Sequence, residues 1–356
     1  MMLESGASQT NSEMSDAANQ AAKAIAEADF LLVASGAGLS ADSGLLTFAT
    51  VSEHLSAVLG EGIKYDQAAS SDMMARNPAL FYGFWFHSAR NYANAQPHEG
   101  YHILRKWREQ KERRLAEHEP VPDRNYALAL SPVFTMTSNV DLFLKRSEVP
   151  TPGALAQIHG SMEKWQCGGV PSGSKFPLFT KGRCCDDMFD PPSDEGMNYD
   201  TMRFSGSAPS CPRCHEGWLR PHVYLFGDGN RFVNKEEETG EQAYRNWCQD
   251  CWLNARIARY KGVLEKRIAG SKEIQAKLKA NTHLRLTIVE IGCGLRVPNI
   301  RKRCEELFAA CPSEQAELVR INPEVTQEQF AAQPTVFVKA RALEGLKEIN
   351  AIMLTY

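Results

Sequence analysis

The sequence predicts an α/β fold in which a Rossmann-like, doubly wound parallel sheet carries a smaller inserted Cys-containing module and a helical module. Three observations lead to this prediction. Short apolar runs with strand character alternate with helical patterns, which is typical of parallel sheets. A glycine-dense turn follows the first of these runs, at residues 34–48. Residues 166–217 hold five of the ten cysteines among many Gly, Pro, Ser and Asp residues, which indicates a loop-rich module with little apolar core of its own.

The first half of the chain begins with polar and small residues at 1–18, which lack the pattern of a secretion signal and are predicted to form a disordered tail. Apolar residues on one side of 16–29 predict a helix, and the run 30–33 predicts a buried strand. Residues 50–125 are predicted to be mainly helical. Strand patterns return at 126–137.

The second half carries the remaining elements of the predicted sheet. Strand patterns occur at 223–226, 284–291, 318–321 and 336–338, and helical patterns at 241–280 and 342–352. Together the elements predict three parts. The Rossmann-like domain comprises 19–50, 126–165 and 218–356, a helical insertion or lid comprises 51–125, and the small cysteine module comprises 166–217.

Composition narrows the class of protein. The chain has 356 residues, 43% of them hydrophobic, and a formal net charge of −3. It is long enough for one large domain with an insertion or for two domains. The weak negative charge argues against direct nucleic-acid binding, and no apolar stretch approaches the ~20 residues that cross a bilayer. We therefore expect reduced cysteines and a cytoplasmic location, with the nucleus as the alternative. The oligomeric state does not follow from the sequence.

The glycine turn is a candidate ligand site. Gly36 and Gly38 lack a β-carbon, so the backbone can turn sharply and approach a diphosphate group closely. Their spacing with Gly44 differs from the usual G-x-G-x-x-G pattern, and many glycine turns bind nothing. The turn by itself is therefore consistent with a ligand site and with a turn that binds nothing.

Two later segments place polar side chains after predicted strands, where crevices open in α/β sheets. Asn139 and Asp141 offer an amide and a carboxylate, although an Asx turn that caps the next helix is the simpler interpretation. His159 precedes Gly160, and a histidine beside such a crevice is suited to take and return a proton near neutral pH.

These segments, in this order, resemble the motifs of the sirtuin family of NAD-dependent protein deacylases. The matching blocks are Gly36-Ala37-Gly38-Leu39-Ser40 with Ser43-Gly44, Ser138-Asn139-Val140-Asp141, Ile158-His159-Gly160-Ser161, Cys211-Pro212-Arg213-Cys214 with Leu219 to Asp228, Ile291 to Val297, and Ile321-Asn322. They extend over residues 30–322. The sequence between them gives little support, so the resemblance is to a divergent member.

The resemblance implies roles for individual residues. The catalytic residues would be His159 as general base, Asn139 as the group that orders the ribose and a water, and Asp141. The residues that bind NAD would be Gly36, Ala37, Gly38, Ser43, Phe48, Ser138, Val140, Gly292, Cys293 and Asn322. An acylated peptide would pair with the strand that contains Val223 and Phe226, followed by Gly227.

The resemblance also implies a structural zinc in the small, zinc-ribbon-like module. Cys211-x-x-Cys214 matches the second of the family's two cysteine pairs, and Cys167 stands where the first begins. Position 170 is Val, so Cys184 or Cys185 would supply the fourth thiolate. A zinc site that uses Cys248-x-x-Cys251 and the absence of any metal are the alternatives.

Several positions depart from the family's pattern. Ala49 stands where an arginine is expected, Ser138 replaces a glutamine, Cys293-Gly294 replaces Thr-Ser, and Asp228 replaces a glutamate. Loss of a charge-assisted contact such as the arginine's costs ~1.5–3 kcal/mol. These changes surround the cofactor site and leave the presumed base in place.

The leading hypothesis is an NAD-dependent protein lysine deacylase that releases nicotinamide and O-acyl-ADP-ribose. A protein mono-ADP-ribosyltransferase or an NAD glycohydrolase on the same scaffold is the second hypothesis. A non-catalytic sensor of NAD or ADP-ribose is the third. The partner would be an acylated protein or peptide in the first case and an ADP-ribose acceptor in the second.

Overall fold

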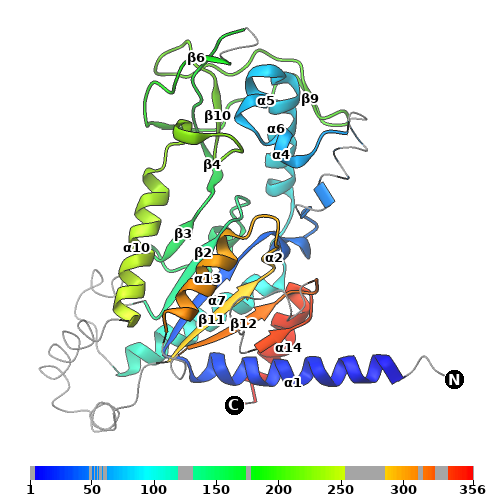
Figure 1. The fold of residues 1–356 in the computed structure, drawn as a ribbon, viewed down its shortest axis with the longest axis vertical. Helices are drawn as coiled ribbons and strands as arrows, with labels where there is room; N and C mark the ends of the chain where they lie inside the picture. Colours follow the sequence, from blue (N-terminus) through cyan, green and yellow to red (C-terminus); the bar gives the residue numbers. More distant parts are fainter. Residues whose placement is uncertain are drawn as a thin grey trace, which may run out of the picture.

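The computed structural model describes residues 5–47, 50–51, 53, 55, 58, 62–118, 131–173, 178–252, 285–311, 316–324 and 336–355. Its centre is a six-stranded sheet in the order β13-β12-β11-β1-β2-β3, and every neighbouring pair is parallel (Figure 1). The strands are β1 Phe30–Ser35, β2 Val133–Thr137, β3 Leu155–Gln157, β11 Leu286–Ile291, β12 Ala316–Ile321 and β13 Val336–Val338. The predicted α/β class is confirmed.

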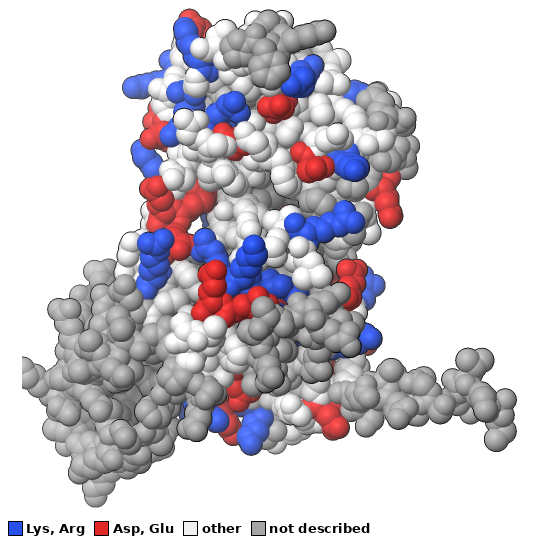
Figure 2. Space-filling view, in the orientation of Figure 1, with Lys and Arg blue, Asp and Glu red and all other residues white. Residues whose placement is uncertain are grey.

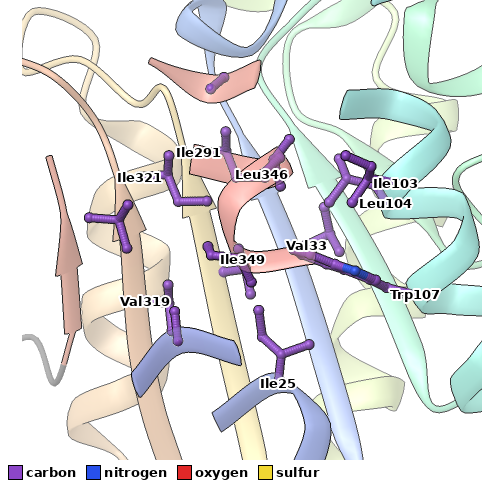
Figure 3. Packing of buried hydrophobic residues seen from close by; sticks show 14 of the residues in the cluster. Ile25, Val33, Ile103, Leu104, Trp107, Ile291, Val319, Ile321, Leu346 and Ile349 are labelled. Atoms are coloured by element: carbon purple, nitrogen blue, oxygen red, sulfur yellow. The ribbon is translucent and has the colours of Figure 1, made fainter. Parts of the chain in front are cut away.

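Helices cover both faces of this sheet. One face packs against α1 Ser5–Glu27, α7 Glu99–His118 and α14 Ala342–Met353, and the other against α10 Lys235–Trp252 and α13 Asn299–Ala309. Successive strand residues point to opposite faces. Leu31 and Val33 of β1 therefore join the first core, which Figure 3 shows, and Leu32 and Ala34 join the second.

The predicted disordered tail at 1–18 is wrong for residues 5–18, because α1 begins at Ser5. The helix packs against α14 and β13, and Ala18, Ala21 and Ile25 are fully buried in the first core. Small alanine side chains allow this close helix packing and favour the helix intrinsically. The apolar stripe of this helix is narrow and the rest of the segment is polar, so the composition alone did not indicate a helix.

The second lobe is built around an aromatic core. It contains α4 Tyr65–Ala68, α5 Ser71–Arg76, α6 Pro78–Asn94 and the antiparallel sheet β10-β4-β7, formed by Leu219–Val223, Gly160–Cys167 and Met188–Phe189. Two small hairpins, β5 Val170–Pro171 with β6 Phe179–Lys181 and β8 Met197–Asn198 with β9 Arg203–Phe204, complete it. Tyr82 and Phe86 stack on Trp165, which joins α6 to β4.

The boundaries differ from the predicted ones in two respects. Helix α7, which the prediction assigned to the insertion 51–125, packs on the main sheet through Tyr101, Leu104 and Trp107, and Trp107 Nε1 donates to Asn350 Oδ1 of α14 over 3.1 Å. Strand β10 and residues 160–165 of β4, which the prediction assigned to the large domain, pair in the second lobe. The predicted strand at 126–130 lies outside the described residues.

The viewed face carries Lys and Arg side chains beside Asp and Glu side chains (Figure 2). Among the described residues, no helix combines the length and the apolar character that a bilayer span requires.

Two glycine turns cross in direct backbone contact at the middle of the sheet. Gly36 N–H donates to Ile291 C=O and Gly38 N–H to Gly292 C=O, both over 3.0 Å. A β-carbon on Gly38 would lie 2.6 Å from the Gly292 Cα, and one on Gly292 would lie 2.5 Å from Gly38 backbone atoms. Gly292 also has φ +62°, a conformation that L side chains rarely adopt. The glycines are therefore required by the packing of the turns themselves.

Gly292→Ala should lower the free energy of unfolding by about 2–4 kcal/mol, because the methyl group meets backbone atoms and the residue keeps a left-handed conformation. The matched control is Gly294→Ala, since Gly294 has open space where its β-carbon would lie. The control should stay within about 0.5 kcal/mol of the parent. Equal stability of the two variants in urea denaturation would contradict the close crossing.

Candidate functional site

The sheet reverses its strand order next to β1, with β2 and β3 on one side and β11, β12 and β13 on the other. Ligand crevices open at such switch points, beyond the carboxyl ends of the strands. The predicted cofactor residues of the glycine turn follow β1, those at 138–141 follow β2, and His159 follows β3. Gly292 and Cys293 follow β11, and Asn322 follows β12. The fold thus brings these segments to one edge (Figure 1).

The side chain of Asn139 is held by two hydrogen bonds. Its Nδ2 donates to Gly36 C=O and to Ser40 Oγ, each over 3.0 Å. Ser40 belongs to the short helix α2 Ala37–Ala41, so these bonds join the ends of β1 and β2. Both amide protons are engaged, which leaves Oδ1 as the open atom of this amide in the described part of the chain. Asn139 can therefore accept a hydrogen bond from a hydroxyl or a water.

Asp141 lies beneath Asn139 and is 7% exposed. Its Oδ2 accepts from Ser40 Oγ over 2.5 Å, and its Oδ1 accepts from Phe143 N–H over 2.9 Å. Burial raises the pKa of this carboxyl above its usual range. The Tyr101 hydroxyl lies 2.9 Å from Ser40 Oγ, and burial likewise raises the pKa of Tyr101. Asp141 thus fixes Ser40, and Ser40 in turn fixes the amide of Asn139.

His159 is half-buried at the end of β3. Its ring bonds to the Ser138 backbone, and its Nε2 lies 3.0 Å from Nδ2 of Asn299, the first residue of α13. An amide nitrogen only donates, so Nε2 is the acceptor, and the ring proton resides on Nδ1 toward the Ser138 carbonyl. Burial lowers the pKa of His159, which favours the neutral ring. The imidazole is thus in the form that a general base requires.

The other predicted cofactor residues have mixed surroundings. The N–H groups of Gly36 and Gly38 donate to the end of β11 and to the turn after it. The N–H of Ala37 has no acceptor in the described part of the chain. Ser43 Oγ accepts from His98 N–H over 3.0 Å. Val140 packs against the second lobe, and its C=O accepts from Met162 N–H. Phe48, like Ala49, lies outside the described residues.

Hydrogen bonds from two side chains fix the turn after β11. Asn322 Nδ2 and Arg301 donate to Cys293 C=O over 3.0 and 2.7 Å. Asn322 Oδ1 accepts from Glu324 N–H, so the amide predicted to contact a cofactor is engaged within the chain. The Cys293 thiol is buried and faces Ile291 C=O at 3.6 Å. These side chains hold the turn in place, and the residues that it exposes are Gly294, Leu295 and Arg296.

The segment predicted to pair with a peptide differs from a regular strand. β10 ends at Val223, and the next residues form a loop. Phe226 N–H and C=O bond to Ala69 and Ser71, and Tyr224 N–H donates to His159 C=O. Within the described residues, Tyr224 C=O and Gly227 N–H carry no hydrogen bond. A peptide can therefore find two backbone partners here, flanked by the exposed rings of Tyr224 and Phe226.

A buried ion pair fixes this loop. Arg220 and Asp228 are 0% and 2% exposed and form a bidentate contact, with Arg220 Nη2 at 2.7 Å from Asp228 Oδ2. Arg220 also donates to Val223 C=O, and Asp228 Oδ2 accepts from Leu225 N–H. Removal of one partner would leave a buried charge uncompensated, which costs about 3–5 kcal/mol. The loop therefore has one well-defined conformation.

Four cysteines of the second lobe converge. The sulfur atoms of Cys167, Cys184, Cys211 and Cys214 all lie within 4.8 Å of one another. Cys184 and Cys211 are 3.6 Å apart, close to the ~3.8 Å expected between thiolates that share a tetrahedral zinc with ~2.3 Å bonds. Cys185 lies next to the cluster, with its sulfur 3.5 Å from that of Cys184. The donor set fits a structural zinc.

The alternative cysteine pair lies elsewhere. Cys248 is on α10 and packs beside the second core of the main sheet. The cluster of four in the described part of the chain does not include it. The side chain of Cys251 lies outside the described residues. The geometry therefore favours Cys184 as the fourth ligand of the predicted module.

A cavity of about 760 Å³ lies on the outer side of β3. None of the predicted site residues lines it. Its walls come from the loop after α9 Phe143–Arg146, from the start of α10 and from β3, and its charged side chains have both signs. The predicted site residues at the carboxyl edge of the sheet thus lie outside this cavity.

No family model matches the sequence. The chain is 27% identical over 146 residues to the NAD-dependent protein deacylase 2 of Pseudomonas aeruginosa, with 41% of this chain and 49% of that protein covered. It is 26% identical over 202 residues to the NAD-dependent protein deacetylase of Shouchella clausii, with 57% and 62% covered. The dog mitochondrial NAD-dependent protein deacylase sirtuin-5 is 27% identical over 215 residues, with 58% of each chain covered.

Solved structures show the same fold. The structure described as Sir2-p53 peptide-NAD+ has a TM-score of 0.53 at 15% identity and covers 95% of this chain and 98% of that one. A structure of Sir2Tm bound to a propionylated peptide has a TM-score of 0.52 at 15% identity, with 93% and 95% covered. The chain is a divergent relative of the sirtuins. It spans about half to three fifths of the length of the curated relatives given above.

Several residues of this sirtuin relative were not anticipated as site residues. Tyr101 is 61 positions from Ser40 and Asn299 is 140 positions from His159, and only the fold brings each pair together. No spacing rule connects them to their partners. Arg220 could have been noticed, because a charged residue within an apolar strand pattern indicates a buried partner. That partner is Asp228.

Purified protein should contain about one zinc per chain, and Cys211→Ala should lose the metal and much of the stability of the second lobe. Cys248→Ala is the control, since Cys248 lies on α10 outside the cluster, and it should retain the zinc. Metal content by mass spectrometry and thermal unfolding with and without a chelator measure both effects. Full zinc occupancy in the Cys211 variant would rule out the four-cysteine site.

Proposed function

We propose that this chain is an NAD-dependent protein lysine deacylase that releases nicotinamide and O-acyl-ADP-ribose. The observation that carries the proposal is the pairing of a neutral imidazole with an oriented amide. His159 has its proton on Nδ1 and its acceptor on Nε2, while Asn139 keeps only Oδ1 open. Both follow neighbouring strands at the switch point of the sheet. The names of the curated relatives support the same activity.

The residues present fit the cofactor. The glycine turn exposes the N–H of Ala37 without a β-carbon at the positions on either side, so a diphosphate could approach the backbone. Asn139 Oδ1 suits a ribose hydroxyl. NAD, when bound, supplies an ADP-ribosyl group with nicotinamide as its leaving group. The chain's own residues would position the reactants, exclude water and move a proton.

His159 would take the proton of a hydroxyl group at Nε2 and later return it. The Ser138 carbonyl stabilises the imidazolium that forms, because it still accepts from Nδ1. Asp141 holds Ser40, and Ser40 holds Asn139, so the amide needs no reorganisation when the reaction begins. The role of the buried carboxylate is thus to position other groups.

The acylated peptide would bind across the loop after β10. Tyr224 C=O and Gly227 N–H offer one acceptor and one donor, and Tyr224 and Phe226 are 49% and 39% exposed. Two hydrogen bonds and two aromatic surfaces suit a short extended segment with an apolar acyl chain. The loop is already fixed by Arg220 and Asp228, which reduces the entropy lost on binding.

The experiment incubates the protein with NAD and a library of acyl-lysine peptides and identifies every product by mass spectrometry. Deacylated peptide and O-acyl-ADP-ribose should appear together in equal amounts. His159→Ala should lower the rate about 10²–10⁴-fold, as expected for loss of a general base. His102→Ala is the control, because His102 is exposed on α7 and should leave the rate unchanged.

Other products would replace the proposal by one of its competitors. ADP-ribose attached to a protein would indicate a transferase, and free ADP-ribose with nicotinamide would indicate an NAD glycohydrolase. NAD binding without turnover, equal in the parent and in His159→Ala, would indicate a sensor. Ala49 and Ser138, which depart from the family's pattern, are the positions that favour these competing activities.

A further inference from the structure

We propose that Asn299 is a positioning residue for His159, which holds the imidazole with Nε2 as its acceptor until a substrate hydroxyl takes the place of the amide. This proposal rests on the proposed function for its chemistry. The contact itself, Asn299 Nδ2 to His159 Nε2 at 3.0 Å, is independent of any activity. It joins two residues that are 140 positions apart in the sequence.

The place of Asn299 in its helix supports this role. Asparagine near a helix start usually caps the backbone with its own side chain. Here Pro298 is the residue before α13, no side chain caps this end, and Asn299 is the first helical residue. Its amide is directed instead to the imidazole. A residue type suited to capping is therefore used to make a contact between elements.

The second ring nitrogen makes the arrangement specific. Nδ1 bonds to the Ser138 backbone from the β2 side, and Nε2 bonds to Asn299 from the α13 side. The ring is held at both nitrogens, so its orientation and its tautomer are fixed together. In water a neutral imidazole exchanges between two tautomers, of which only one presents Nε2 as an acceptor. Asn299 thus favours the catalytically competent form.

The nearby positive charge also favours the neutral form of the His159 ring. Arg303 lies one turn further along α13 and lowers the pKa of His159, in addition to the effect of burial. Its guanidinium is paired with Glu241 of α10. From the β2 side the ring meets the neutral Ser138 carbonyl, and the backbone of His159 accepts from Tyr224 N–H of the loop. A carboxylate at position 299 would therefore oppose the effect of Arg303 and raise the pKa of His159.

Two substitutions separate positioning from a merely structural role. Asn299→Asp places a carboxylate beside Nε2, where it stabilises the imidazolium. The pKa of His159 should then rise by about 1 unit or more. The acidic limb of the pH–rate profile should shift to higher pH by the same amount. Asn299→Ala removes the donor. Only the Ser138 carbonyl then selects the tautomer, so the Nε2-protonated form should gain population, and kcat should fall about 10-fold with little change in KM for NAD.

The readout that does not need activity is an NMR titration of ¹⁵N-labelled histidine, with the His159 signals assigned from the His159→Ala spectrum. Lys302→Ala is the control, since Lys302 is exposed on the same helix and should leave the titration and the fold unchanged. An unchanged His159 pKa in Asn299→Asp, together with an unchanged tautomer in Asn299→Ala, would overturn the proposal. Absence of NAD turnover in the parent protein would instead remove the proposed function and leave the titration result valid.

Discussion

The contact on which the rest of the structure depends is the crossing of the two glycine turns that follow β1 and β11. Their backbones lie so close that a single β-carbon at Gly38 or Gly292 would overlap main-chain atoms. This contact places the start of α2 against the end of β11. Ser40 is then within reach of Asp141 and Asn139, and the turn that leads to Asn299 lies beside His159. The geometry of the crevice thus follows from a steric requirement of the main chain.

The chemistry of the site is set by hydrogen bonds that leave selected atoms open. Asn139 spends both amide protons within the chain and keeps an acceptor. His159 spends Nδ1 and keeps Nε2 for an exchangeable partner. Asp141 is buried and occupied by two donors. A polar network in which each member is satisfied except at Asn139 Oδ1 and His159 Nε2 is pre-organised for the reaction that we propose, because little has to move when substrates bind.

The sequence alone was sufficient for the features that depend on local pattern. Apolar strands, the glycine turn and the helix 342–352 follow from periodicity and punctuation, and the order of the motifs led to the correct fold class. Local pattern failed at α1, where alanines alternate with polar residues and the burying partner α14 lies at the other end of the chain. It also left Cys184 and Cys185 equivalent, since both precede the pair Cys211-x-x-Cys214 by similar lengths. Partners such as Tyr101 and Asn299 could not be found, because only tertiary packing relates them to the site.

The strand β10 connects the cysteine cluster of the second lobe with the loop that follows Val223. It begins a few residues after Cys214, pairs with Cys167 through Leu219, and ends at Val223, where the loop with Tyr224 and Gly227 begins. One short strand therefore lies between the cysteine cluster at one end and, at the other, the loop where we propose that a peptide binds. A disturbance at the cysteine end would be transmitted along this strand to a surface several residues away. Zinc bound at the four cysteines would thereby stabilise the loop where we propose that a peptide binds, although the metal lies at the other end of the strand.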